Sequence, residues 1–486
     1  MFLGIDLGTS GLKAIVLDRA HRVLASASAP LTVQQPQPLW REQAPADWWR
    51  SCETALDAVL AQVDRRRIEA IGLSGQMHGA TLLDARGEVL RPAILWNDGR
   101  AWRECAELEA AVPVAREITG NLMMPGFTAP KLAWLRRHEP AVFDRVAHVL
   151  LPKDWLRLRL TGEFATDRSD AAGMLWLDVA RRDWSDELLA ATGLARAQMP
   201  RLHEGPEVTG RLREDIARRF GLQRIPVVAG GGDNAAGAVG VGVVRAGQAM
   251  LSLGTSGVCF AATDRFLANP AQAVHSFCHA LPATWHLMSV MLSAAACLDF
   301  SARLVGAEVP QLLAEAQARG LNDDTPLFLP YLNGERTPHN NPAAQGVFFG
   351  LTAGTDRADL FNATLEGVGH GLAQGLGALE AAGADFSGGL TLIGGGSRSA
   401  YWAQMLADLS GKTLLRRAGG EVGPALGAAR LARMGREGIG ADAACPEPAL
   451  VAAHAPDAAR HALLHERAAR FDALYRRVAP CFPAAA

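Results

Sequence analysis

A five-residue glycine-rich motif occurs twice in the chain, and its composition suits phosphate binding. Leu7-Gly8-Thr9-Ser10-Gly11 returns as Leu253-Gly254-Thr255-Ser256-Gly257, so the second copy lies 246 residues after the first. Glycine-rich turns let backbone N–H groups approach phosphate oxygens without side-chain bulk. Two such loops that face each other could hold a polyphosphate from both sides. The alternative is two unrelated tight turns in a glycine-rich chain.

The residues that precede the two loops differ. Asp6 precedes the first loop and Ser252 precedes the second. A carboxylate beside a polyphosphate needs a cation between them, so Asp6 is a candidate to hold Mg²⁺ through water, because Mg²⁺ keeps several of its waters. The alternative is an aspartate that caps a turn. The chain has no GxxxxGK[ST] sequence, which disfavours an ordinary P-loop.

Asp233 is the strongest candidate for a general base. It follows Gly230-Gly231-Gly232, which leaves room for a substrate, at the end of the buried apolar run 225–228. An alcohol that attacks a phosphoryl group must lose its proton, and a positioned carboxylate can accept it late in a loose transition state. The alternative is that Asp233 N-caps a helix that begins at Asn234, and the two roles are compatible.

Two further segments could contact a polyol. His78, in the segment 76–79, could hydrogen-bond sugar hydroxyls, although a lone histidine is more often structural. Residues 96–100 combine the ring of Trp96 with an amide, the carboxylate of Asp98 and a guanidinium. An aromatic ring suits the C–H face of a polyol and the polar groups suit its hydroxyls. The same residues also suit an ordinary polar turn.

Two glycine clusters in the second half could border a nucleotide base. They are residues 394–399 and 419–424, where the backbone could lie flat against adenine and near ribose. Glycine clusters of this kind are weak signals when taken alone.

Local sequence patterns indicate the elements that carry these residues. The two motif copies lie between apolar runs, which predicts two β-hairpins, each closed by a Gly-Thr-Ser-Gly loop. An amphipathic pattern predicts a helix over 47–63 with Asp47 near its N-cap. The other expected elements are strands at 23–33, 68–73, 80–83, 225–228 and 390–393, mainly helices from about 100 to 220, and a helix at 425–433 with Pro424 near its first position.

Composition narrows the class of protein. The 486 residues, 49% hydrophobic and 20% charged, are typical of a globular chain of about two or three domains. A net charge of −2 gives no basic footprint for nucleic acid or a membrane surface. Seven cysteines without a CxxC pair indicate buried free thiols in a reducing cytoplasm, and we read no secretory signal. The repeated motif predicts two domains, 1–245 and 246–486.

Longer segments resemble the FGGY family of carbohydrate kinases. Residues 126–135 are similar to the first signature of the family, and residues 346–351 with 359–366 are similar to the second. The resemblance covers nearly the whole chain. It implies an α/β, two-domain ATPase fold of the actin, hexokinase and Hsp70 type, made of duplicated ribonuclease H-like domains with an interdomain cleft.

Within the family, three substrate segments are most similar to those of bacterial members that act on D-xylulose. They are 74–81, 94–100 and 334–342. The resemblance therefore implies ATP-dependent phosphorylation of the 5-hydroxyl of D-xylulose in xylose catabolism, with Asp233 as the base. Asp6 would act near Mg²⁺ and the transferring phosphate.

The resemblance also implies contacts for each ligand. The implied sugar contacts are Met77, His78, Trp96, Asp98, Asp233 and Asn234. The implied ATP contacts are Gly8, Thr9, Ser10, Lys13, Gly254, Thr255, Ser256, Gly394, Gly395, Gly396 and Gly423. The implied metal contacts are Asp6 and Asp233.

Two other functions remain open from the sequence. One is a kinase of the same family for another ketopentose or a polyol, which would keep the phosphate chemistry and differ around 74–79 and 96–100. The other is a non-catalytic sugar-binding regulator or a chaperone-like ATPase of the same fold. The presence of both Asp6 and Asp233 favours catalysis. The family also suggests a homodimer, and we expect neither a nucleic-acid partner nor a membrane.

Overall fold

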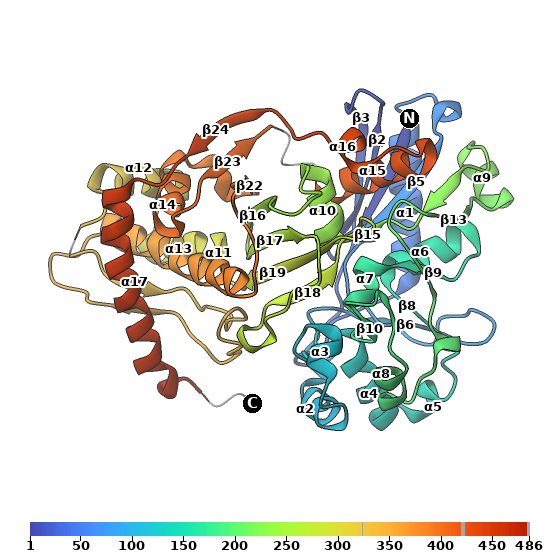
Figure 1. Ribbon diagram of the computed structural model, residues 1–486, viewed down its shortest axis with the longest axis horizontal. Coiled ribbons are helices and arrows are strands. Elements are labelled where there is room, and N and C mark those ends of the chain that lie inside the picture. The colour runs from blue at the N-terminus through green and yellow to red at the C-terminus, as the bar shows by residue number, and fades with distance from the viewer. Residues whose placement is uncertain (323, 419–422, 484–486) are drawn as a thin grey trace.

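The computed structural model describes residues 1–322, 324–418 and 423–483, and within them two seven-stranded sheets organise the chain (Figure 1). The first sheet has the order β13 (Val208–Arg211), β14 (Pro226–Val228), β5 (Ala70–Gly75), β1 (Phe2–Leu7), β2 (Gly11–Leu17) and β3 (Val23–Pro30), and β15 (Gly231–Gly232) pairs with β5. The second has the order β18 (His275–Cys278), β19 (Trp285–Met291), β17 (Gly257–Thr263), β16 (Ala249–Leu253), β22 (Leu390–Ile393), β23 (Leu414–Arg417) and β24 (Leu450–His454).

The two sheets repeat one topology. β1 and β16 each form an antiparallel hairpin with the next strand and each pair in parallel with a later strand, β5 or β22. β5 and β22 then pair in parallel with β14 and β23, and an antiparallel strand follows at that edge in both sheets. The internal repeat predicted from the glycine motif is therefore confirmed as a duplicated sheet.

The identical motif copies close their hairpins differently. In the first hairpin Leu7 pairs with Leu12, which leaves a four-residue loop, as predicted. In the second hairpin Leu253 pairs with Gly257, so the loop has three residues and the predicted Gly-Thr-Ser-Gly loop is wrong there. In both hairpins the glycine after the serine also pairs with the outer strand, β3 in one half and β19 in the other.

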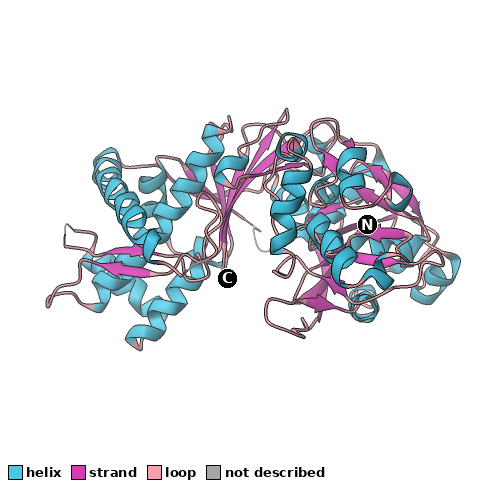
Figure 2. Cartoon of the chain, turned by 90° about the horizontal axis from the view of Figure 1, so that it is seen from below, coloured by secondary structure: helices cyan, strands magenta, loops and turns pink. Residues whose placement is uncertain are grey.

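Helices cover both sheets (Figure 2). In the first half they are α1 (Pro45–Leu60), α2 (Trp102–Ala111), α3 (Ala115–Thr119), α4 (Thr128–His138), α5 (Pro140–Phe143), α6 (Pro152–Thr161), α7 (Arg168–Ala172), α8 (Asp186–Ala191), α9 (Glu214–Phe220) and α10 (Asp233–Val241). In the second half they are α11 (Ala295–Val305), α12 (Val309–Arg319), α13 (Arg357–Ala381), α14 (Ala400–Ser410), α15 (Gly423–Glu437), α16 (Ala441–Ala444) and α17 (Ala458–Val478).

Short strands connect these layers. They are β4 (Glu42–Gln43), β6 (Thr81–Leu83), β7 (Ala93–Ile94), β8 (His148–Leu150), β9 (Ala165–Asp167), β10 (Leu177–Asp178), β11 (Asp183–Trp184), β12 (Arg201–His203), β20 (Leu327–Leu329) and β21 (Val347–Phe349). The strand predicted over 390–393 has the observed bounds, whereas the strand predicted over 23–33 ends at Pro30. α1 begins at Pro45 with Ala44 as its N-cap, so Asp47 lies in the first turn, near the N-cap as predicted. Proline is favoured in the first helical turn because its missing N–H has no partner there.

A helix of the second half packs on the first sheet. α15 lies beside β1, β5 and α10, and Figure 1 shows it, in red, next to the blue strands. A Cβ at Gly4 would lie 2.0 Å from the carbonyl oxygen of Ala425, and one at Gly72 would lie 1.9 Å from that of Ala428. Only glycine permits this approach of helix to sheet. The domain boundary at residue 245 stays a prediction. The packing of α15 on the first sheet joins residues from both sides of this boundary.

The structure also bears on the expectations that composition gave for the cysteines and for membrane spans. Within the described residues, which include all seven cysteines, each is a free thiol; six are buried and Cys481 is exposed. The expectation of buried free thiols is therefore confirmed except at Cys481. No helix in the described part of the chain is both long and apolar enough to cross a membrane.

Candidate active site

A cavity of about 320 Å³ lies between the two halves of the chain. The first half lines it with Met77, His78, Trp96, Met124, Gly126, Phe127, Asp233 and Asn234. The second half lines it with Ser252, Ser256, Val258, His275, Met288, Val290 and Arg336. Five of the six predicted sugar contacts therefore meet in one cavity, together with Ser256 of the second glycine loop. The volume suits a ligand the size of a small sugar.

Asp233 is the first residue of α10 and faces this cavity. Its N-cap is Gly232, so the alternative that Asp233 caps the helix is wrong. Its Oδ1 accepts from the backbone N–H of Asn234 at 2.7 Å and from the side-chain amide of Asn234 at 2.9 Å. Burial, and then the charge of Asp6, raise the pKa of Asp233 to about 7, although both bonds from Asn234 oppose this shift. A carboxyl group with such a pKa can take up a proton near neutral pH.

Asp6 lies near Asp233, at the end of β1. Burial raises the pKa of Asp6 to about 6, and the Ser74 hydroxyl and the charge of Lys13 oppose the shift. Lys13 is the residue opposite Asp6 in the hairpin. Asp6 Oδ1 is buried and has no hydrogen-bond partner among the described residues. A buried carboxylate oxygen without a partner is costly, so this atom is ready to accept a ligand or a cation.

These two carboxylates fit the magnesium role. Two like charges close enough to perturb each other gain from a cation, and Mg²⁺ is commonly held by one or two carboxylates together with phosphate oxygens and water. The described residues contain no group of three or more histidine, cysteine, aspartate or glutamate side chains suited to a metal. A cation here would therefore use Asp6 and Asp233.

His78 presents one ring nitrogen to the cavity. Its Nδ1 lies 2.7 Å from the carbonyl oxygen of Gly173, so Nδ1 carries the proton and Nε2 is left as an acceptor. Burial lowers the pKa of His78 to about 3, so the ring is neutral near neutral pH. The backbone at His78 has φ of 66°, a left-handed conformation that is uncommon for a residue with a side chain. The buried ammonium of Lys131 donates to the carbonyl oxygen of His78 at 2.7 Å and holds this turn.

The first glycine loop also positions the aromatic wall of the cavity. Trp96 Nε1 donates to the hydroxyl of Thr9 at 2.9 Å, and that hydroxyl donates to Gln76 Oε1 at 2.9 Å. The Thr9 hydroxyl thus has both of its hydrogen-bond roles filled within the chain. Gly8 N–H donates to the carbonyl oxygen of Gly11 at 3.0 Å, which closes the loop. The contact of Gly8, Thr9 and Ser10 with phosphate stays a prediction.

The second glycine loop packs against the start of α11. The carbonyl oxygens of Gly254 and Thr255 accept from the N–H groups of Ala295 and Ala294, at 3.0 and 2.9 Å. Thr255 is exposed, and Ser256 reaches the cavity. The phosphate role of this loop also stays a prediction.

The predicted adenosine loops lie beyond the second loop. Gly394 follows β22, and its Cβ position would lie 2.6 Å from the carbonyl oxygen of Leu253. Gly395 has open space at its Cβ position, as does Gly423 at the start of α15. The remainder of the predicted 419–424 cluster, residues 419–422, lies outside the described residues. Gly394, Gly395, Gly396 and Gly423 therefore stay predicted nucleotide contacts.

Asp98 does not line the cavity. Its side chain is buried, and its Oδ1 accepts from the backbone N–H and the Nε of Arg100, both at 2.9 Å. Its Oδ2 accepts from the N–H of Arg41 at 2.6 Å and from the guanidinium of Arg100 at 2.7 Å. The guanidinium of Arg100 in turn lies 3.7 Å from the centre of the Trp40 ring. Asp98 therefore orders this turn. Both of its carboxylate oxygens already accept hydrogen bonds within the chain, which disfavours the sugar contact predicted for it.

Two polar cavity residues of the second half, Arg336 and His275, were not predicted from the sequence. Arg336 and His275 both line the cavity, and Arg336 Nη1 lies 3.2 Å from His275 Nε2. Arg336 falls within the segment 334–342, whose likeness to sugar kinases was the one available signal. His275 lies on β18 and belongs to no motif.

Comparisons with known proteins identify the family of this chain. Sequence models of the FGGY family of carbohydrate kinases match residues 1–240 for the N-terminal domain and 249–435 for the C-terminal domain. The chain belongs to the FGGY family of carbohydrate kinases. It accordingly has the two-domain FGGY kinase fold, of the actin and hexokinase-like ATPase type.

Individual FGGY relatives are similar over nearly their whole length. The xylulose kinase of Escherichia coli (strain K12) is 57% identical over 490 residues, which cover 99% of each chain. The xylulose kinase of Klebsiella pneumoniae is 60% identical over 435 residues, 89% of this chain and 90% of the relative. Among solved structures, a xyloylose kinase from Brucella ovis has a TM-score of 0.95 at 47% identity, with 99% of each chain covered.

Proposed function

We propose that this FGGY kinase transfers the γ-phosphoryl group of ATP to the 5-hydroxyl of D-xylulose. The observation that carries the proposal is the cavity between the halves, where Asp233, Asn234, Met77 and His78 meet. The substrate named for the relatives at 57% and 60% identity supports the choice of sugar. The same family includes kinases for other carbohydrates, so a different ketopentose or a polyol is the alternative.

Asp233 acts as the general base in this proposal. As the 5-oxygen of the sugar attacks the γ-phosphorus, its proton passes to the carboxylate of Asp233. The new O–P bond forms while the bond from the γ-phosphorus to the bridging oxygen breaks, and ADP leaves with the electron pair. The two bonds from Asn234 hold Oδ1 in a fixed direction, which leaves Oδ2 to accept the proton.

Asp6 and Asp233 would hold Mg²⁺. Bound there with the nucleotide, the ion would neutralise charge on the phosphate oxygens. The buried, unpartnered Oδ1 of Asp6 is the atom best prepared to face that charge. Lys13, opposite Asp6, keeps this carboxyl group more acidic than burial alone would.

The sugar is oriented by groups from both halves. His78 Nε2 accepts from a hydroxyl, and the amide of Asn234 and the exposed ring of Trp96 face the same cavity. Arg336 adds a cationic donor from the opposite wall. Because the walls belong to different sheets, closure of the halves over the sugar would exclude water and limit hydrolysis of ATP.

The substrate is tested by ADP release. The purified protein is assayed with Mg²⁺, ATP and a panel of ketoses and polyols, which includes D-xylulose, D-ribulose, xylitol and glycerol. We expect the highest kcat/KM for D-xylulose and a sugar phosphate as product. A higher kcat/KM for another member of the panel would assign the enzyme to that substrate. ADP release without any sugar phosphate would contradict a sugar kinase.

The base is tested with Asp233→Asn. Loss of a general base costs about 10² to 10⁴-fold in rate. We therefore expect kcat to fall by that order, while the affinity for ADP, measured by calorimetry, stays close to that of the parent. Turnover equal to the parent would remove Asp233 from the mechanism.

A further inference from the structure

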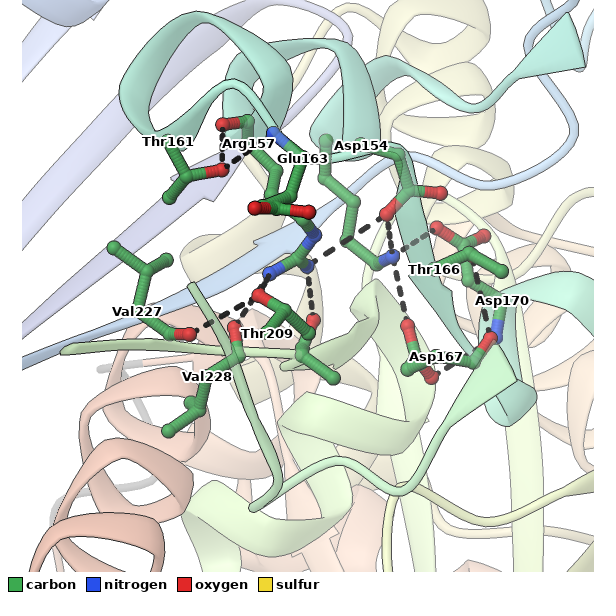
Figure 3. Close-up of polar contacts among 12 residues, drawn as sticks. Asp154, Arg157, Thr161, Glu163, Thr166, Asp167, Asp170, Thr209, Val227 and Val228 are labelled. Atoms are coloured by element: carbon green, nitrogen blue, oxygen red, sulfur yellow. Dashed lines mark hydrogen bonds and ion pairs between the residues drawn. The ribbon is translucent and has the colours of Figure 1, made fainter. Parts of the chain in front are cut away.

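A buried cluster of charged side chains, part of which Figure 3 shows, is linked by hydrogen bonds to the segment before Asp233. Lys153 Nζ lies 2.6 Å from Asp154, 2.7 Å from Asp167 and 3.1 Å from Asp170, and all four side chains are fully buried. Figure 3 shows the three carboxylates turned toward one another from α6, β9 and α7. Burial opposes the charge of Lys153, but the three acids raise its pKa. Each of the three carboxylates thus forms an ion pair with Lys153 in a fully buried setting.

One branch of hydrogen bonds runs from this cluster to the residue before Asp233. Asp167 caps α7, and its Oδ2 accepts from the N–H of Ser169 at 2.8 Å and also from the Ser169 hydroxyl. The Ser169 oxygen accepts from the N–H of Gly232 at 3.1 Å. Gly232 is the N-cap of α10, and Asp233 is the next residue.

A second branch holds the strand that leads into the loop. Arg157, one turn after Lys153 on α6, donates to the carbonyl oxygen of Val228 at 2.7 Å and to that of Ala229. It also donates to the hydroxyl of Thr209 at 2.8 Å. The end of β14 is thus fixed through its carbonyl groups, and Gly232 is fixed through its amide.

The other end of α7 reaches His78. Gly173 follows the last residue of α7, and its N–H donates to the carbonyl oxygen of Asp170 at 3.0 Å. The Gly173 carbonyl oxygen accepts from Nδ1 of His78 at 2.7 Å. This five-residue helix and its C-cap residue Gly173 therefore contact both His78 and the segment before Asp233.

We propose that Ser169 is a positioning residue, which sets the place of Asp233 by anchoring the N–H of Gly232 to the buried Lys153–Asp167 pair. The Ser169 hydroxyl donates to one partner and accepts from the other, so its geometry is set from both sides. Gly232 adds a second constraint, because a Cβ there would lie 2.9 Å from Met77 Cγ. The backbone before Asp233 consequently has little freedom. The proposal rests on the proposed role of Asp233 as the base.

The test is Ser169→Ala, compared with Ser301→Ala as a matched control. Ser301 is also buried and hydrogen-bonded through its hydroxyl, at 2.7 Å to Thr364, but it lies on α11 in the second half. A displacement of about 1 Å at a reacting group can cost about 100-fold in rate. We expect kcat of Ser169→Ala to fall about tenfold or more, with the KM for ATP within about twofold of the parent. Ser301→Ala should keep the parent kcat.

The outcomes separate positioning from simple stability. If both variants lower Tm by similar amounts and both keep the parent kcat, the Ser169 bond is only structural and the proposal is wrong. Should Ser169→Ala fail to fold, Ser169→Cys is measured instead, because a thiol keeps the shape and weakens the hydrogen bond. The same fall in kcat is then expected. Asp233→Asn is measured in the same assay. If Asp233→Asn keeps the parent kcat, the proposed role of Asp233 as the base is wrong. If Asp233→Asn loses activity and Ser169→Ala does not, only the positioning role of Ser169 is wrong.

Discussion

The two glycine-rich hairpins share five residues and yet differ in register and in chemistry. The first leaves four residues in its loop and places Asp6 opposite Lys13. The second leaves three and places Ser252 opposite Val258, both of which line the cavity. The identical pentapeptide therefore does not determine the loop by itself. The two halves share one sheet topology, but their hairpins place different residues opposite each other.

The division of tasks extends beyond the loops. The first sheet ends in groups that can move a proton or bind a cation, Asp6 and Asp233. The matching strands of the second sheet lead to Gly254 and Gly394, which have no side chain that could play either part. The two acidic candidates of the site thus both come from the first half.

Within this comparison, the largest effect should follow when the first hairpin is made to resemble the second. Asp6→Ser removes a carboxylate that we propose as a ligand of Mg²⁺, and loss of the transition-state stabilisation it supports should cost about 3 kcal/mol, or about 100-fold in kcat. Steady-state kinetics with saturating Mg²⁺ and ATP measures this loss. The matched change Ser252→Ala should alter kcat by less than about threefold. Equal losses in both variants would mean that the hairpins share one chemical role.

The pH dependence should report the same asymmetry. Below its pKa of about 7 Asp233 is protonated and cannot accept a proton, so kcat/KM should fall about tenfold per unit of pH on the acid side and level off above pH 7. Since the charge of Asp6 helps to raise this pKa, the acid limb should move to lower pH in the residual activity of Asp6→Ser. An acid limb near pH 4 in the parent protein would show that Asp233 is not the titrating base.

A smaller effect should separate the nucleotide loop from the sugar cavity. Gly395→Ala places a methyl group in open space, so folding should be unaffected, but a bound nucleotide would meet it. One extra methyl group in a tight contact costs about tenfold in binding, so the KM for ATP should rise by about that factor while the KM for the sugar stays constant. Gly377→Ala, on an exposed face of α13 with equal open space, serves as the control. A rise in the sugar KM instead would place this loop at the other substrate.

The smallest effect is expected at Asp170. Burial, and the charges of Asp154 and Asp167, raise its pKa well above the ordinary value, although Lys153 opposes the shift. Asp170 is therefore the acid of this cluster whose charge is most opposed by its surroundings, and Asp170→Asn replaces it with a neutral group of the same shape. Tm should stay within about 2 °C of the parent and kcat should be unchanged. Asp167→Asn, which removes a negatively charged partner of Lys153, should lower both Tm and kcat. A large loss of Tm or kcat in Asp170→Asn would mean that Asp170 is ionised.

The sequence predicted the parts that depend on local pattern. Alternating apolar residues around the repeated motif gave both hairpins, and the apolar run 390–393 gave a strand with the observed bounds. Met77, His78 and Asp233 were predicted together and meet in the cavity. Their segments follow strands whose carboxyl ends share one edge of a sheet, which is a consequence of topology that a sequence can reveal.

The sequence missed the parts that depend on pairing across space. Asp98 was predicted as a sugar contact. The sequence shows Arg100 two residues later, but it does not show that both carboxylate oxygens of Asp98 accept hydrogen bonds from it. Lys153 and Asp167 are neighbours only because α6 and β9 fold together. Arg336 reaches the cavity from the other half of the chain, and no local period indicates such a contact.

Because α15 of the second half packs on the first sheet, each half of the chain needs the other to bury this contact. Residues 1–245 expressed alone would expose Gly4 and Gly72 on a strip of sheet that fits the backbone of α15, a helix that begins only at Gly423. The other half would carry that helix with its small-residue face in water. The first sheet therefore gains this covering helix only after nearly the whole chain has been synthesised.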